Sequence, residues 1–142
     1  MTFAGISYFA IVVAAAAAWL LGAAWYMLFS QPWQEAVGLS ATKLKKVERE
    51  PGFYVPFILA FLSLIVMAWV LAGLIAHFGP GQFTVRNGIV TGAFCWLGFV
   101  ITTMAVNNSF AQRDRRLMLI DGGHWLLVLL LMGAILGAFG PG

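Results

Sequence analysis

The sequence predicts an all-α membrane protein: four transmembrane helices in an up-down bundle, with a short amphipathic helix in the first long loop. Hydrophobic residues make up 62% of the 142 residues and charged residues only 9%, whereas a soluble domain usually carries about 25% charged residues. The charged residues also gather in three places, Glu35–Glu50, Arg86 and Arg113–Asp121. They leave four long charge-free windows, which we interpret as one four-span domain over residues 1–142.

Each charge-free window is long enough to cross a bilayer, since about 20 apolar residues span the hydrocarbon core. Backbone polar groups must be satisfied internally in lipid, so the spans are expected to be helices. The first window has no basic segment ahead of its apolar run, and we expect a retained span rather than a cleaved signal peptide. The predicted spans are Ile6–Phe29, Val55–Phe78, Gly88–Val106 and Ile120–Phe139.

The basic residues predict how the protein is oriented. Four spans place the loops Ser30–Gly52 and Asn107–Leu119 on one side and both termini on the other, and only Arg86 among the basic residues falls on the terminal side. Cytoplasmic loops carry an excess of Lys and Arg. The sequence therefore predicts a multi-pass protein of the bacterial inner (cytoplasmic) membrane with both termini in the periplasm. The basic residues expected at the membrane surface are Lys43, Lys45, Lys46, Arg49, Arg113, Arg115 and Arg116.

The loop after the first span is expected to hold two short helical pieces. Ser30 would cap the first, with Pro32 near its first position and Gly38 as its stop. Ser40 would cap the second, which would run to Glu50. We interpret the loop as an amphipathic segment at the lipid headgroups, with its cations towards anionic lipid; a solvated charged loop is the alternative. Nucleic acid is not an expected partner, because glutamates interrupt the basic residues.

Small residues recur at four-residue spacing in every span. Such stripes let helix backbones approach closely, either inside one bundle or between copies of the chain. Besides the lipid bilayer, the expected partners are therefore a second copy in a homo-oligomer or the other subunits of a larger membrane complex. The stripes are Ala14, Ala18 and Gly22; Ala68, Ala72 and Ala76; Gly88 and Gly92; Gly98 and Thr102; Gly133 and Gly137.

Polar residues at the basic-side ends of three spans form a candidate ligand site, since such residues inside membranes mark function. Asp121 and His124 are three residues apart and share a helical face. We expect the His124 ring to bond to another helix, because an unpartnered buried imidazole would cost roughly 1–3 kcal/mol. We expect Asp121 to lie near the run Arg113–Arg116. The candidate residues are Trp25, Tyr26, Asn107, Asp121, His124 and Trp125.

The same residues also have purely structural interpretations. Asp121 could cap the fourth helix or pair with an arginine before it, and the tryptophans could belong to interfacial aromatic belts. His124 could simply bond across helices to Asn107 or Tyr26. Two potential ligands, Asp121 and His124, are too few for a metal site, and the sequence shows no catalytic constellation. No metal, cofactor or catalytic residue is expected.

Two stretches resemble the bacterial family called domain of unknown function 1761. The first is Gly22-Ala23-Ala24-Trp25-Tyr26, followed by Phe29, Trp33 and Gly38-Leu39. The second is Gly98–Asn107, then Phe110, then Leu119-Ile120-Asp121-Gly122-Gly123-His124-Trp125, with Gly122 where the family more often has Ala. The resemblance implies a small multi-span membrane protein. It implies no established activity and hence no functional residues.

These observations predict a non-enzymatic protein that acts as an accessory or oligomeric membrane subunit through helix and lipid contacts. A proton or ion path usually needs more than one carboxylate and one histidine, which is the reason for this preference. The alternative is a small oligomeric transporter or channel, with Asp121, His124 and Asn107 lining a cytoplasmic vestibule. A cavity reaching His124 would favour the transporter, and a site packed shut would favour the contact protein.

Overall fold

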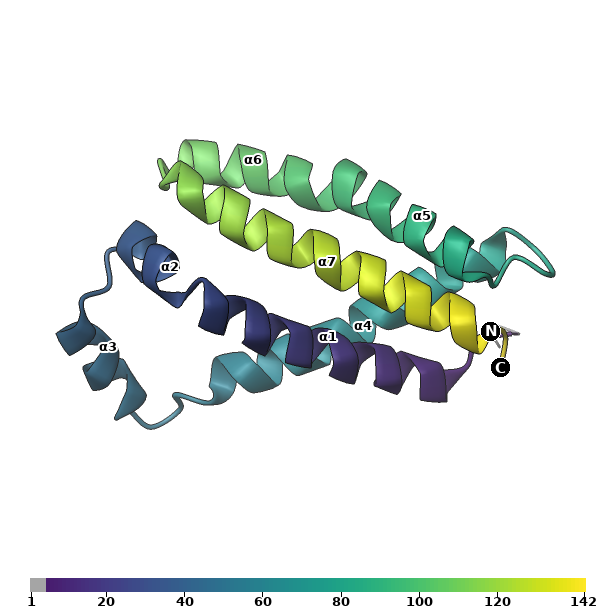
Figure 1. Cartoon of the computed structure of the whole chain (residues 1–142), viewed down its shortest axis with the longest axis horizontal. Helices are drawn as coiled ribbons and strands as arrows, with labels where there is room; N and C mark the ends of the chain where they lie inside the picture. Colours follow the sequence, from purple (N-terminus) through teal and green to yellow (C-terminus); the bar gives the residue numbers. More distant parts are fainter. Residues whose placement is uncertain (1–4) are drawn as a thin grey trace.

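The computed structural model describes residues 5–142, which contain helices and no strands. Four helices are long and apolar enough to cross a membrane, which confirms the predicted four-span class. The spans are α1 (Tyr8–Leu28), α4 (Val55–His77), α5 (Val85–Cys95) continued through the π-helical turn η1 (Trp96–Val100) into α6 (Ile101–Phe110), and α7 (Arg115–Phe139). The first long loop holds α2 (Ser30–Val37) and α3 (Ala41–Glu48). α1 begins and α7 ends at the same end of the bundle (Figure 1).

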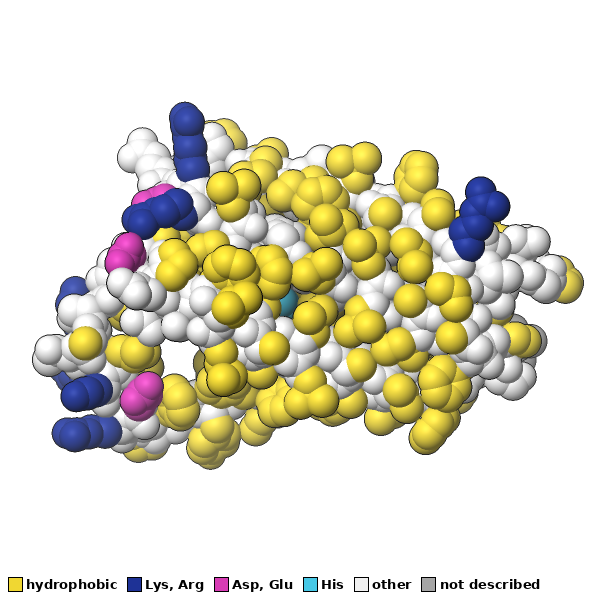
Figure 2. Space-filling view, viewed as in Figure 1, with side chains coloured by type: hydrophobic (Ala, Val, Ile, Leu, Met, Phe, Trp, Pro, Cys, Tyr) yellow, Lys and Arg dark blue, Asp and Glu magenta, His cyan; other side chains and the backbone are white. Residues whose placement is uncertain are grey.

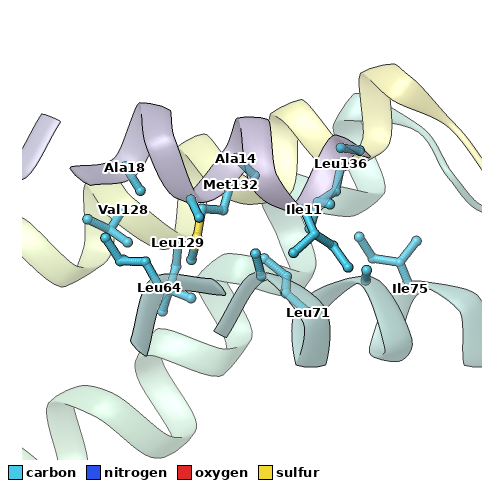
Figure 3. Packing of buried hydrophobic residues seen from close by; sticks show 14 of the residues in the cluster. Ile11, Ala14, Ala18, Leu64, Leu71, Ile75, Val128, Leu129, Met132 and Leu136 are labelled. Carbon is cyan, nitrogen blue, oxygen red and sulfur yellow. The ribbon is translucent and has the colours of Figure 1, made fainter. Parts of the chain in front are cut away.

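α7 is the centre of the bundle. It contacts each of the other three spans and α2, and it lies between α1 and the α5–α6 helix, which make no contact with each other in the described chain (Figure 1). α4 packs against α1 and also touches α5 and α7. The buried core lies where α1, α4 and α7 meet (Figure 3). It contains Ile11, Ala14, Ala18, Leu64, Leu71, Ile75, Val128, Leu129, Met132 and Leu136.

The tightest helix contact joins α5 to α7 through glycines. A Cβ atom on Gly88 or on Gly133 would overlap the backbone carbonyl of the other residue, and a Cβ on Gly137 would overlap the carbonyl of Thr84. Without side chains, the two backbones touch directly, as small residues allow in membranes. The glycine stripes predicted on these two helices are therefore used for contacts inside the bundle. Gly98 differs, since a Cβ there would meet nothing within 4 Å.

The outer surface divides by polarity along the bundle (Figure 2). Large hydrophobic side chains are exposed on the outward sides of the spans, for example Phe9, Met27, Phe94 and Phe99. Exposed apolar area on this scale has no favourable partner in water, and hydrocarbon is its natural solvent. The charged side chains gather mainly at the end that carries α2, α3 and the turn between α6 and α7. The chain is thus built as a membrane protein.

Two helix ends differ most from the sequence-based boundaries. α6 runs to Phe110 and α7 begins at Arg115, so the expected loop Asn107–Leu119 shrinks to residues 111–114. Asp114 caps α7, because its side chain accepts a hydrogen bond from the Arg116 backbone N–H at 2.9 Å. Caps decide where a helix starts, and this cap stands beyond the apolar run. Asp121, seven residues further on, lies inside the helix and does not cap it.

The first loop folds largely as expected. Ser40 caps α3 by accepting a hydrogen bond from the Lys43 backbone N–H at 3.3 Å. Gly38 ends α2 in the left-handed conformation, with φ of 76°, which suits a residue without a side chain. Ser30 is not a cap: Phe29 holds that position and α2 has no side-chain cap. Only Phe29 separates α1 from α2, so Ser30 is already the first residue of α2 and cannot act as its cap.

Candidate functional site

A hydrogen bond between α1 and α7 forms the centre of the candidate site. The Tyr26 hydroxyl donates to Oδ1 of Asp121 at 2.5 Å. The two residues stand 95 positions apart in sequence, and the packing of α1 along α7 brings them together. A hydrogen bond to an ionised acceptor is shorter and stronger than a neutral one. This contact fixes both side chains at the end of the bundle that carries the charged loops.

Two indoles reach the same turn of α7. Trp25 donates its Nε1–H to the Ile120 carbonyl at 3.0 Å, and Trp96, from η1, donates to the Gly122 carbonyl at 2.8 Å. Glycines make room for this approach, because a Cβ on Gly123 would stand 3.1 Å from the Trp25 ring. Trp25 is therefore an interior hydrogen-bond donor rather than only a belt residue. Trp96 is not among the predicted site residues, because a lone tryptophan inside a span carries no pattern that predicts its partner.

His124 lies deeper and is 7% exposed. Its ring packs between aromatic rings, with centroid distances of 5.0 Å to Tyr26 and 4.7 Å to Trp125. Its Nε2 side faces Gly22, where a Cβ would come within 3.0 Å. The expected hydrogen bond to another helix is not formed: Nδ1 is buried and has no partner among the described residues. The His124 ring is therefore held by packing, and Gly22 of α1 leaves the space that the ring occupies.

Asp121 does not form an ion pair with the arginines that were expected near it. Among residues 5–142 no ion pair joins Asp121 to the run Arg113–Arg116. Arg116 instead contacts Asp114 at 2.9 Å and Glu35 of α2 at 3.3 Å. The Arg116 guanidinium beside Asp114 lowers the pKa of that carboxyl through the hydrogen bonds between them. The reason for the difference is the early start of α7, which places its arginines on the first turn, beyond the apolar core.

Asn107 is not part of the site. It is exposed on α6, whereas Asn108 lines a groove beside α7. A π-helical turn holds one extra residue, and each residue of a helix turns it by about 100°. The turn η1 therefore rotates everything after Val100 relative to an uninterrupted helix. Sequence spacing alone could not show this rotation, which leaves Asn107 on the exposed face of α6.

Comparison with known proteins supports the resemblance noted above. A family model described as "Protein of unknown function (DUF1761)" matches residues 9–137. The chain belongs to this family. No curated protein and no solved structure matches the chain. The match covers both motifs. In the structure of this DUF1761 protein, Trp25-Tyr26 of the first motif and Asp121–Trp125 of the second meet in one contact between α1 and α7.

A cavity of about 450 Å³ in this DUF1761 protein reaches Asp121 from the charged end. Trp33 of α2 forms one wall, and Arg113 and Asp114 of the α6–α7 turn lie at its mouth. His124 does not line the cavity. Trp33 also packs edge-on against Tyr26, with ring centroids 6.2 Å apart. The cavity has the volume of a small-molecule site and combines the carboxyl groups of Asp114 and Asp121 with one aromatic ring, that of Trp33.

An apolar core lies beyond the site of the DUF1761 protein. Beyond His124, the helices α1, α4 and α7 meet in apolar side chains such as Ala18, Val128 and Met132, each with 0% exposure. Within residues 5–142, no three His, Cys, Asp or Glu side chains come close enough to hold a metal ion. The arrangement therefore suits binding of a solute from the charged side.

Proposed function

We propose that this protein is a non-enzymatic membrane protein that binds a small organic ammonium ion at Asp121, from the side of the charged loops. The cavity that ends on Asp121 is the observation that carries the proposal. The carboxylate lies six residues into α7 from Arg115, which is about 9 Å along the helix axis. Tyr26 holds one carboxylate oxygen by its hydrogen bond, and the carboxylate also lines the cavity.

The walls of the cavity support a cationic rather than an anionic ligand. An ammonium group is attracted both to a carboxylate and to the faces of aromatic rings such as Trp33. Arg113 also lines the cavity, but it is exposed at the mouth, where water and salt screen its charge. Asp121 is partly buried, and its charge is screened less. The innermost charge of the cavity is therefore negative.

The interpretation as an accessory or oligomeric subunit stays a prediction. A second copy could still cover the exposed apolar faces of the spans. His124 is packed and does not line the cavity, which favours this interpretation over a channel, but Gly88, Gly133 and Gly137 are used in the contact between α5 and α7 and are not available to a second copy. The cavity at Asp121 favours a site-based function such as ligand binding, which could serve transport if several copies assemble.

Ligand binding can be tested with three four-carbon probes of similar size: n-butylammonium, butyrate and butanol. We expect only n-butylammonium to raise the unfolding temperature of the purified protein in detergent, at low salt where screening is weak. Asp121→Asn should weaken its binding at least tenfold, equivalent to about 1.4 kcal/mol. Isothermal titration gives the affinities.

Asp114→Asn is the matched control for the ammonium experiment. It removes a second carboxylate of the same cavity, and Asn preserves the helix cap. Binding should survive this change. A stabilising effect of butyrate, or equal losses in the two Asn variants, would show that the cavity has no ammonium site at Asp121.

We also propose that the protein lies in the bacterial inner membrane with both termini in the periplasm. The exposed Lys43, Lys45, Lys46 and Arg49 lie on and after α3, at the same end as the α6–α7 turn, and such basic ends face the cytoplasm. Alkaline phosphatase fused after Gly142 should be active in a bacterial host, and a fluorescent protein fused there should stay dark. The opposite pair of results would reverse the orientation.

A further inference from the structure

A second concavity runs between α6 and α7 and meets the cavity at Asp121 only at the α6–α7 turn, where Gln112, Arg113 and Asp114 line both. It measures about 860 Å³, and Asp121 does not line it. Its inner part is apolar, with Trp96, Ile101 and Leu126. Its outer part, at the charged end, is lined by Asn108, Arg113 and Arg115 among others. The groove therefore changes from apolar to basic along the length of the helices.

The backbone itself builds this groove. α5 packs against α7 with backbones in contact at Gly88 and Gly133, whereas α6 meets α7 only sparsely. The π-helical turn η1 lies at this change, and such turns are frequent at functional sites. On the other wall, Gly122 has no side chain that could fill the space, and a Cβ there would stand 3.0 Å from Ile101 of α6.

We propose that this groove binds one acyl chain of an anionic phospholipid, with the lipid phosphate held by Arg113 and Arg115. The apolar inner part matches a hydrocarbon chain. The basic outer part lies where a headgroup would stand, because it is at the charged end of the bundle (Figure 2). Arginine suits a phosphate well, since its planar fork of N–H donors matches the phosphate oxygens.

The two arginines are available for a phosphate. Within residues 5–142, neither Arg113 nor Arg115 pairs with an acidic side chain. Asp114 also lines the groove, but its carboxylate is bound by Arg116, and this neighbour offsets its repulsion of an anion. Asn108 and Gln112 add amide donors at the same end. The headgroup end of the groove therefore has a net positive charge without a partner.

Native mass spectrometry of the detergent-purified protein can test this site with phosphatidylglycerol and phosphatidylcholine of identical chains. We expect phosphatidylglycerol to bind more tightly. The double variant Arg113→Gln, Arg115→Gln should lower its affinity about 30-fold, since each basic residue near an anionic lipid contributes about a fivefold factor. The matched control is Lys43→Gln, Lys45→Gln, which removes the same charge from α3, away from the groove.

The apolar part is tested by Ala105→Phe, because Ala105 lines the groove on α6 and a larger side chain would occupy the space of the acyl chain. Phosphatidylglycerol binding should fall while the unfolding temperature of the lipid-free protein stays unchanged. Equal binding of the two lipids, or equal losses in the arginine and lysine variants, would overturn the proposal. So would a dimer that Ala105→Phe dissociates in lipid-free detergent, because a second copy would then fill the groove.

Discussion

Gly133→Leu is expected to unfold the α5–α7 pair. The backbones of Gly133 and Gly88 are in direct contact, so any side chain at position 133 must push the two helices apart. Overpacked interiors typically cost 1–3 kcal/mol and sometimes more, and we expect about 3 kcal/mol or more here because the obstacle is backbone. Gly137→Leu should act in the same direction, since its Cβ would overlap the Thr84 carbonyl. Thermal unfolding in detergent, followed by circular dichroism, measures the loss.

Gly98→Leu is the control for this prediction. It is a glycine of the opposing long helix, in η1 between α5 and α6, with open space around the position of a Cβ. We expect it to leave the unfolding temperature within a degree or two, because a leucine facing lipid costs little. Unchanged stability of both Gly133→Leu and Gly137→Leu would mean that this face does not hold the bundle together.

Asp121→Leu is expected to destabilise the protein by about 2 kcal/mol, the second large effect. The change leaves the half-buried Tyr26 hydroxyl beside α7 without its acceptor, and stranded polar groups cost about 1–3 kcal/mol. Adding Tyr26→Phe should recover part of that loss, because the stranded hydroxyl is then gone. Unfolding by heat of the two single variants and the double variant gives the coupling energy. Additive losses would show that the hydrogen bond contributes nothing.

His124→Leu should change stability in the opposite direction. The buried Nδ1 has no partner, so an apolar side chain of similar size should stabilise the protein by about 1 kcal/mol. Such a gain would mean that the imidazole is not kept for stability, which agrees with a site-based function. A loss as large as that of Asp121→Leu would instead make His124 a structural residue.

The fold could be predicted from the sequence because the bilayer imposes few solutions. The charge-free windows had to be helices, and the chain order then placed the termini at one end. The ends of the spans were less predictable. Apolar runs show where lipid begins, but α7 starts at Arg115, where Asp114 supplies the cap. A helix can continue past the hydrocarbon into the headgroup region, and hydropathy does not record this.

The candidate site was predictable where spacing on one helix decides it. Asp121 and His124 share a face, and the glycines between them admit a neighbouring helix, as Trp25 shows. The partners across helices were not predictable, because they depend on rotation of each helix about its axis. The side chain that bonds to Asp121 is Tyr26 rather than an arginine. Trp96 also belongs to the site, although no pattern in the sequence indicates it.

The central position of α7 has a consequence for biosynthesis. Membrane helices are inserted in the order of their synthesis, and Tyr26 precedes its acceptor by 95 residues. At 5–20 residues per second, this gap lasts roughly 5 to 20 s. During that time α1 and α4 can already pack against each other, but the Tyr26 hydroxyl has no carboxylate to meet. α5 likewise cannot pack against Gly133 until α7 has been made. The nascent bundle thus stays incomplete until α7 enters the membrane, and any factor that guards unfinished membrane proteins would act in this interval.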